Sequence, residues 1–242
     1  MRYELPLLRG NLVRRYQRFR ADVRLEDGAL VTAHCPNPGA MTSSADPGRP
    51  VLLSDHGAGT SHKLRYTWEA IRMPSAWVNV NTARANRVVA EALAAGAIEE
   101  LLGYDRVRPE APLGRSGRVD FLLSGPRRAD CYVEVKSATL RVGRAALFPD
   151  ARSERAVRHV VELARLARRG RRAVLLFLVG RGDCRSVGPA DHVHPEYGEA
   201  LRKAAKDGVE VLAYQARVSP RGVGLGRRLP VVLEPAPDQP SS

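Results

Sequence analysis

The chain has 242 residues, 44% of them hydrophobic, and a formal net charge of +13 at pH 7. This length allows one substantial hydrophobic core, or one core with a small second domain. No apolar run approaches the roughly 18 uncharged residues needed to cross a bilayer, which excludes a membrane partner. The first residues, Met1 to Glu4, lack the apolar segment of a signal peptide, so we expect a cytoplasmic protein.

The excess of positive charge points to a polyanionic partner. The chain holds 39 lysines and arginines against 26 aspartates and glutamates. Such a surface attracts nucleic acid through the release of condensed counterions. Most of the basic residues are arginines, which GC-rich coding also produces, but coding bias does not explain the imbalance of sign. DNA is therefore the expected partner.

The first third of the chain reads as short strands separated by turn residues. Strand-like segments are expected over residues 19–25, 30–34, 50–54, 63–73 and 76–80. Clusters of Gly, Pro, Asn and Asp separate them. About five short strands in so few residues predict a small β-barrel, which we place in residues 1–82.

A change of hydrophobic period after Thr82 marks a second domain, expected over residues 83–233. Thr82 is a candidate N-cap for the first helix of this domain. The expected order is a helix, three strands, a helix, a strand, a helix and a strand, over residues 84–95, 104–110, 118–124, 130–140, 153–169, 172–179, 195–206 and 209–217. This alternation predicts an α/β domain with a mixed sheet. The proline-rich tail, 234–242, is expected to be disordered.

Two carboxylates and an amine fall together in the expected sheet. In the strand around Val133 to Lys136, alternate side chains share a face, so Glu134 and Lys136 point the same way. The preceding strand carries Asp120, and a turn at Gly125 makes a hairpin plausible. Asp120 can then lie beside Glu134.

This grouping suits metal-assisted phosphodiester cleavage. Mg²⁺ or Mn²⁺ would accept oxygen ligands from Asp120, Glu134 and the carbonyl of Val135. Lys136 would orient a metal-bound water or the developing charge. The alternative is that Glu134 and Lys136 form a solvent-facing pair, as in any amphipathic strand. Their position in the apolar half of an α/β core favours the functional interpretation.

The helix expected after residue 153 offers three further candidates. Glu154 precedes Val157 and Val161 by three and seven residues, so we expect it on the apolar stripe that faces the sheet. His159 lies four residues after Arg155, on the same side of the helix. These two either contact one phosphate or pack against each other. Asp150 is expected to cap this helix.

Basic and aromatic residues alternate near the start of the barrel. This group could clamp a phosphate and stack a base, or it could be an ordinary solvated strand face. It comprises Arg14, Arg15, Tyr16, Arg18 and Phe19.

Several motifs in order resemble those of the sugar fermentation stimulation protein A (SfsA) family. The resemblance covers nearly the whole chain, from Leu12 to Leu233. Its marks are the segments Ala33–Gly39, Tyr66–Glu69, Val80–Thr82, Arg118–Leu123, Cys131–Lys136 and Leu147–Ala151.

The resemblance implies a fold and a function. It implies an OB-like barrel followed by a domain like the PD-(D/E)xK nucleases, DNA binding without strong sequence preference, and a link to the regulation of sugar metabolism. It also implies that Glu91, on the first helix, corresponds to an additional metal-side acid, although a solvated helix face explains that residue equally well. We therefore expect a DNA-binding protein with a divalent-metal site and no small-molecule cofactor. The alternative is an active Mg²⁺-dependent nuclease.

Overall fold

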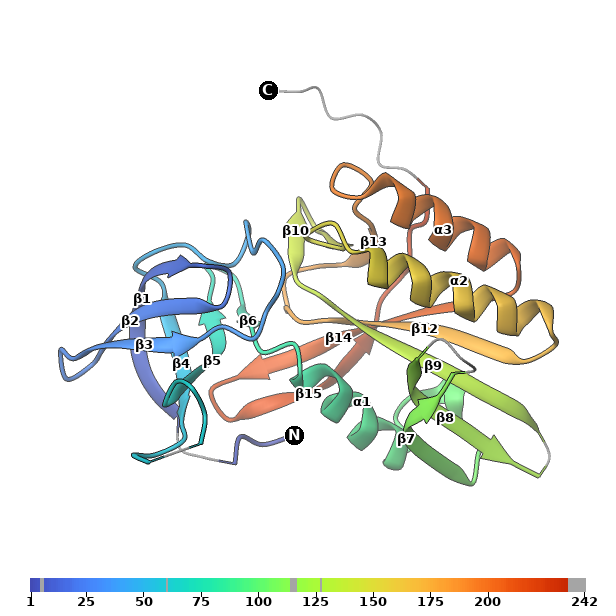
Figure 1. Ribbon diagram of the computed structural model, residues 1–242, viewed down its shortest axis with the longest axis horizontal. Helices are drawn as coiled ribbons and strands as arrows, with labels where there is room; N and C mark the ends of the chain where they lie inside the picture. The colour runs from blue at the N-terminus through green and yellow to red at the C-terminus, as the bar shows by residue number, and fades with distance from the viewer. Residues whose placement is uncertain (5–6, 60, 114–116, 127, 235–242) are drawn as a thin grey trace.

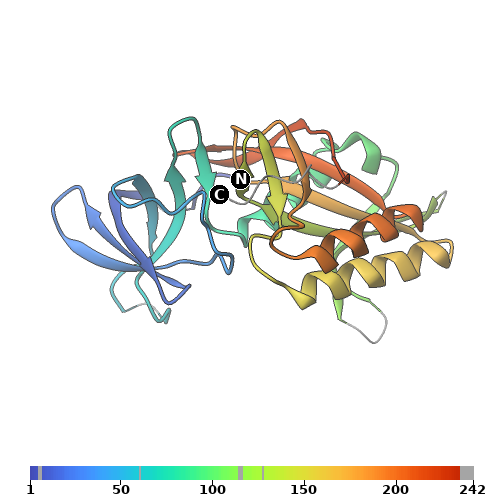
Figure 2. The same cartoon turned by 90° about the horizontal axis from the view of Figure 1, so that it is seen from above.

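The computed structural model describes residues 1–4, 7–59, 61–113, 117–126 and 128–234. Figure 1 shows a small barrel of blue and teal N-terminal strands beside a larger α/β domain. In Figure 2 the two domains lie end to end along the long axis of the molecule. The division of the chain at residue 82 stays a prediction. The expected disordered tail, 234–242, lies outside the described residues from position 235 onward.

The N-terminal domain is a closed barrel, as predicted. In the described chain its strands are β1 (Leu7–Tyr16), β2 (Arg20–Leu25), β3 (Leu30–His34), β4 (Pro50–Asp55), β5 (Tyr66–Arg72) and β6 (Trp77–Asn79). They follow the order β3-β2-β1-β4-β5-β6, and a parallel pairing of β3 with β5 closes the sheet. Strand β1 was not among the expected strands, although a solvated strand face was one interpretation of its last residues. Only Gly10 and Leu12 are buried along it, and a glycine gives no hydrophobic signal.

The second domain is built around a mixed sheet, which confirms the predicted fold class. Its elements are α1 (Arg84–Ala94), a 3₁₀ turn (Glu99–Leu101), β7 (Arg106–Pro112), β8 (Arg118–Gly125), β9 (Arg128–Ala138), β10 (Leu140–Val142), β11 (Ala145–Phe148), α2 (Glu154–Arg168), β12 (Arg172–Val179), β13 (Ser186–Pro189), α3 (Pro195–Lys206), β14 (Glu210–Ser219) and β15 (Gly222–Arg228). The main sheet has the order β15-β14-β12-β9-β8-β7, in which β9, β12 and β14 run parallel.

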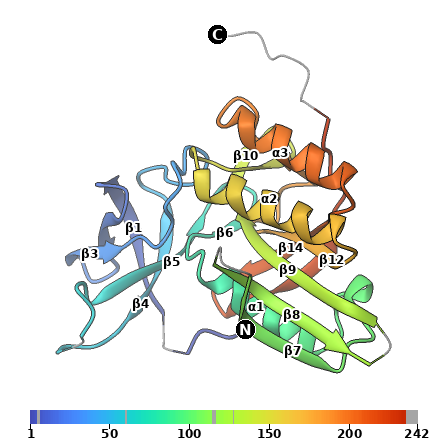
Figure 3. The same cartoon turned by 45° about the vertical axis from the view of Figure 1, so that its right-hand side comes forward.

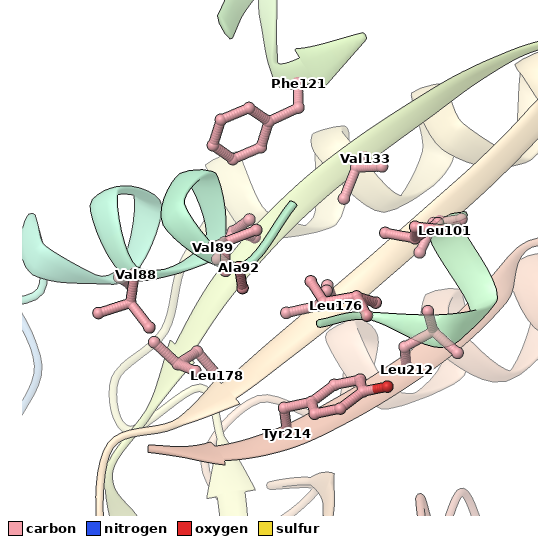
Figure 4. Packing of buried hydrophobic residues seen from close by; sticks show 14 of the residues in the cluster. Val88, Val89, Ala92, Leu101, Phe121, Val133, Leu176, Leu178, Leu212 and Tyr214 are labelled. Carbon is pink, nitrogen blue, oxygen red and sulfur yellow. The ribbon is translucent and has the colours of Figure 1, made fainter. Parts of the chain in front are cut away.

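Helices cover both faces of this sheet (Figures 1 and 3). On one face α1 packs Val88, Val89 and Ala92 against Leu176 and Leu178 of β12, as Figure 4 shows. On the other face lie α2 and α3, which pack against the opposite side chains of β12. Burial on both sides explains why β12 is almost continuously apolar.

Several local features differ from expectation, among them the edge strand β15, which was not predicted. Strands β10, β11 and β13 form a separate small sheet that was not predicted, because segments of three or four residues are too short to show a period. Thr82 does not cap α1; its hydroxyl donates to the carbonyl of Pro36 (2.8 Å). Ser153 caps α2, whereas Asp150 accepts a hydrogen bond from the amide of Met41 in the barrel (3.3 Å).

A buried ion pair joins the two domains. Arg181 is 1% exposed, and its Nε lies 2.6 Å from Oδ1 of Asp183. The same guanidinium donates to the carbonyl of Thr139 in the α/β domain (2.9 Å) and to the hydroxyl of Ser43 in the barrel (3.1 Å). One side chain therefore bonds to both domains.

A second buried pair lies where the chain passes from barrel to helix. Glu69 of β5 is 0% exposed and accepts two hydrogen bonds from Arg84 at the start of α1, at 2.6 and 3.0 Å. Ser54 and Asn81 donate to the same carboxylate. Buried charges require such partners, so α1 is held to the barrel.

Among the described residues, no helix has the length and apolar character needed to cross a bilayer.

We expect Arg181→Met to destabilise the protein by about 3–5 kcal/mol, because the buried carboxylate of Asp183 loses its buried partner and keeps only Arg141 and Ser75, and because Thr139 and Ser43 lose their shared donor. Urea unfolding measures this change. Arg152→Met is the matched control: Arg152 pairs with Glu196 at the surface, where both side chains are more than half exposed. Its cost should stay below about 1 kcal/mol. Equal costs for the two variants would contradict a structural role of Arg181.

The same pair should make stability depend on acid pH. Burial acts to raise the pKa of Asp183, but the hydrogen bonds and charge of Arg181 outweigh burial and lower it to about 2. A lowered pKa stabilises the folded state fully above about pH 4, and this contribution is lost as the pH falls toward 2. Between these values the thermal midpoint should fall more steeply for the native chain than for Asp183→Asn. Parallel curves would contradict the assignment.

Candidate metal and nucleic-acid site

The hairpin formed by β8 and β9 brings the predicted residues together. The two strands are antiparallel, with Phe121 opposite Val133. One step further along the ladder, Asp120 of β8 reaches Glu134 and Val135 of β9. The period-2 alternation therefore holds: Val133 and Val135 enter the core beneath α1, while Glu134 and Lys136 approach α2.

Asp120 is anchored on both of its oxygens. Its Oδ2 accepts a hydrogen bond from the amide of Val135 (2.7 Å), and its Oδ1 accepts one from Nδ2 of Asn86 in α1 (2.7 Å). Burial and the neighbouring charge of Glu134 raise the pKa of Asp120. Two carboxylates placed so closely favour a bound cation, because a cation offsets their repulsion.

Glu134 is held as an anion inside the protein. Its side chain is 5% exposed, and its Oε1 accepts from Nζ of Lys136 (2.5 Å) and from Nδ1 of His159. Burial alone would raise the pKa of Glu134, but the hydrogen bond from His159 and the charge of Lys136 outweigh it and lower the pKa. Arg155 donates from Nε to Nε2 of His159 (3.3 Å), which assigns the imidazole proton to Nδ1. Arg155 and His159 thus contact each other, as one of the two sequence interpretations predicts.

The donor set suits a hard divalent cation. Among the described residues, none donates to Oε2 of Glu134, and each oxygen of Asp120 accepts only one hydrogen bond. Magnesium sites commonly use one or two carboxylates and fill the remaining positions with water and substrate phosphate. The described residues contain no group of three or more His, Cys, Asp or Glu arranged as a metal site, so the protein itself supplies two carboxylates here. The carbonyl of Val135 as a third ligand stays a prediction.

A cavity of about 450 Å³ opens beside these residues, between the β7–β8 end of the sheet and α2. Asp120 and His159 line it, together with the guanidinium groups of Arg118, Arg155 and Arg158. Arg118 and Arg158 have no hydrogen-bond or ion-pair partner in the described part of the chain. Guanidinium groups without such partners, in a cavity that Asp120 also lines, suit an anionic ligand that carries phosphate.

Glu91, predicted as an additional metal-side acid, lies away from the site. Glu91 pairs with the ammonium of Met1 (2.6 Å) and with Arg87 (3.7 Å), five residues along α1 from Asn86 and therefore on another side of the helix. The α1 residue that contacts Asp120 is Asn86, which sequence reasoning missed. Its signal was modest: a polar residue three positions before the buried Val89.

Glu154 was expected to face the sheet, and this expectation is wrong. Its side chain is 74% exposed, near the imidazole of His194. The buried stripe of α2 runs through Ala156, Val160, Leu163 and Ala164, about one position away from the stripe chosen in the sequence. Val157 and Val161 are more hydrophobic than Ala156 and so indicated the wrong side of the helix. Ala156 is buried because a small side chain allows α2 to approach the sheet closely.

The basic group of the barrel is divided in the structure. Arg14 pairs with Asp22 (2.8 Å) and lies over the ring of Tyr16. Arg15 donates to the carbonyls of Asn37, Gly39 and Ala40 and so supports a loop of the barrel. Arg18 and Phe19 are exposed at the turn between β1 and β2. The last two are the members most open to a ligand.

Comparison with known proteins matches both domains in order. A family model described as the SfsA N-terminal OB domain matches residues 13–80, and one described as the sugar fermentation stimulation protein RE domain matches residues 83–222.

Relatives match along almost the whole chain. A sugar fermentation stimulation protein homolog of Pelobacter propionicus is 51% identical over 228 residues, which cover 94% of this chain and 98% of the relative. The homolog of Geobacter sulfurreducens is 50% identical over 227 residues, with 94% and 97% covered. The structure of Pyrococcus furiosus SfsA in complex with Ca²⁺ superposes with a TM-score of 0.86 at 27% identity and covers 96% of this chain and 98% of that one. The chain therefore belongs to the sugar fermentation stimulation protein (SfsA) family.

Proposed function

We propose that this protein binds DNA without strong sequence preference and carries a divalent-metal site at Asp120 and Glu134. The observation that carries the proposal is a cavity lined by Asp120, His159 and the guanidinium groups of Arg118 and Arg158, which have no partner in the described part of the chain. Glu134 and Lys136 lie behind this lining, where Glu134 is bonded to His159. Carboxylates that attract a cation, beside arginines that attract phosphate, suit a nucleic-acid backbone. The name of the family, sugar fermentation stimulation protein, supports a link to the regulation of sugar metabolism.

The metal assignment has support beyond the donor set. The related SfsA of Pyrococcus furiosus, of the same fold, was solved with Ca²⁺. Ca²⁺ and Mg²⁺ both prefer oxygen ligands, and Mg²⁺ is the smaller and usually retains water and phosphate in its shell. We assign Mg²⁺ or Mn²⁺ as the working ion, held by Asp120, Glu134 and the carbonyl of Val135.

The second candidate function is a metal-dependent nuclease with the catalytic group Asp120, Glu134 and Lys136. When bound, the cation would lower the pKa of a water molecule and offset charge on the attacked phosphate. The ammonium of Lys136 is held by Glu134 (2.5 Å), next to the candidate metal position, where it would orient a nucleophile. His159 fixes the same carboxylate from α2. The mixed sheet with helices on both faces and the grouping of Asp120, Glu134 and Lys136 on its β8–β9 hairpin support a PD-(D/E)xK nuclease-like arrangement.

Metal binding should depend on both carboxylates. We expect Mn²⁺ or Ca²⁺ to bind the native chain in calorimetric titration, and Asp120→Asn and Glu134→Gln to weaken binding at least about tenfold. Glu91→Gln is the matched control, because that carboxylate is paired with Met1 away from the cavity. Weaker binding in Glu91→Gln but not in Asp120→Asn would place the site elsewhere.

Cleavage assays separate binding from hydrolysis. Plasmid and single-stranded DNA are incubated with the native chain and with Mg²⁺, Mn²⁺ or EDTA. A nuclease cuts only with metal and loses at least about a hundredfold in rate in Asp120→Ala and Lys136→Ala. If the native chain cuts no substrate with either metal, the nuclease function is excluded and DNA binding stands alone.

Binding should weaken steeply as salt rises. The logarithm of the DNA association constant should fall linearly with the logarithm of salt concentration, and Arg158→Ala should reduce the slope by about one unit. Arg168→Ala is the control, because Arg168 pairs with Asp207 at the other end of α2. A response that does not change with salt would contradict the electrostatic argument.

A further inference from the structure

Aromatic rings follow one another across the outside of the barrel. They belong to Phe19, His34, His56 and His62, and we call them the ring row. Phe19 lies 6.5 Å from His34, centroid to centroid, with the two planes only 23° apart. His56 and His62 lie 4.2 Å apart. The row is separate from the cavity beside Asp120, and the function proposed above rests on none of its four residues.

Backbone pairing connects the two halves of the row. His34 of β3 is the direct partner of Thr67 in β5, across the pairing that closes the barrel. The hydroxyl of Thr67 lies 2.9 Å from Nε2 of His56. The side chains before and after these positions, Ala33 and Trp68, are buried in the barrel. His34 and Thr67 therefore point outward, and the rings share one outer face.

Phe19 is held outward by a strained turn. It is 47% exposed, although exposure of a phenyl ring to water is unfavourable. The two residues before it, Gln17 and Arg18, have φ angles of 48° and 62°, a region that residues other than glycine seldom adopt. The carbonyl of Phe19 accepts from the amide of Cys35 (2.9 Å), which fixes the turn against β3. The ring is thus presented without the entropic cost of ordering a flexible loop.

The charge around the row is positive. The acids near it are already paired: Asp22 with Arg14 and Asp55 with Arg65. Arg18 and Arg20 at one end and Lys63 at the other are exposed. Arg20 is the backbone partner of His34. Rings in line between cations match the pattern by which proteins bind single-stranded nucleic acid, in which bases stack on rings and phosphates meet the flanking charges.

We propose that the ring row binds single-stranded nucleic acid by base stacking. Duplex bases are already stacked on one another, so the ring row should bind single strands more tightly than duplex. Arg118 and Arg158 at the cavity would contact only the phosphate backbone, which both forms of nucleic acid offer. The inference rests on the proposed DNA-binding function and adds the strand state of the ligand.

The test is fluorescence anisotropy with labelled oligo(dT), oligo(U) and a duplex of equal length, all in EDTA so that no metal-dependent cleavage occurs. Phe19→Ala should weaken oligo(dT) binding roughly tenfold and leave duplex binding within about twofold. The double variant His34→Ala/His56→Ala should act in the same direction. The conservative variant Phe19→Tyr, which keeps an aromatic ring, should bind oligo(dT) as tightly as the native chain. Comparison of oligo(dT) with oligo(U) shows whether the natural strand is DNA or RNA.

Leu30→Ala is the matched control, because Leu30 is 58% exposed on β3 but lies outside the row. It should bind all three probes like the native chain. The inference is overturned if Phe19→Ala binds oligo(dT) within twofold of native, or if it loses duplex affinity by the same factor. Either result leaves the salt-dependent DNA binding and the metal site intact, whereas a native chain that binds no probe overturns the proposed function as well.

Discussion

The guanidinium of Arg181 determines how the two domains sit together. It is almost completely buried and binds Asp183, the carbonyl of Thr139 and the hydroxyl of Ser43 at once. A charged group so far from water is tolerated only when every donor finds a partner, and the partners here come from both domains. The Glu69–Arg84 pair repeats the arrangement at the chain connection. The orientation of the barrel toward the cavity therefore follows from hydrogen-bond geometry rather than from apolar packing alone, which tolerates sliding.

In the candidate site, opposing effects act on the pKa of Glu134. Its carboxylate is taken from water and would become neutral, but Lys136 and His159 keep it ionised. The ammonium of Lys136 therefore stabilises the ionised carboxylate, and a cation bound as proposed would have to share that carboxylate with it. The pKa of Asp120 is raised instead, because burial and the charge of Glu134 outweigh its two uncharged hydrogen-bond donors, an amide and a carboxamide, and the charge of Lys136. The two carboxylates therefore differ in pKa: that of Glu134 is lowered, which favours the anion, and that of Asp120 is raised, which favours the protonated form.

Sequence reasoning recovered the elements whose signals are local. The alternation around Glu134, the apolar run of β12 and the turn residues of the barrel gave the barrel, the mixed sheet and the hairpin that joins Asp120 to Glu134. Features that depend on three-dimensional neighbours were missed or wrong. Asn86 reaches Asp120 only because α1 packs on this face of the sheet, and Glu91, on another side of α1, pairs with Met1. The side of α2 that carries Glu154 depends on how closely α3 and the sheet approach, which hydrophobicity alone does not report.

The buried polar contacts between the two domains also limit whether evolution can separate the domains. A barrel separated from the rest of the chain would retain Glu69 in its interior without Arg84, and the α/β domain alone would expose Arg181 and lose Ser43. Neither half is an independent module in the sense of a domain that can be recombined with foreign partners, because each contains a charge that the other neutralises or satisfies. Exchange of either half in evolution therefore requires coordinated change across the interface, and the two halves are expected to be inherited as one unit.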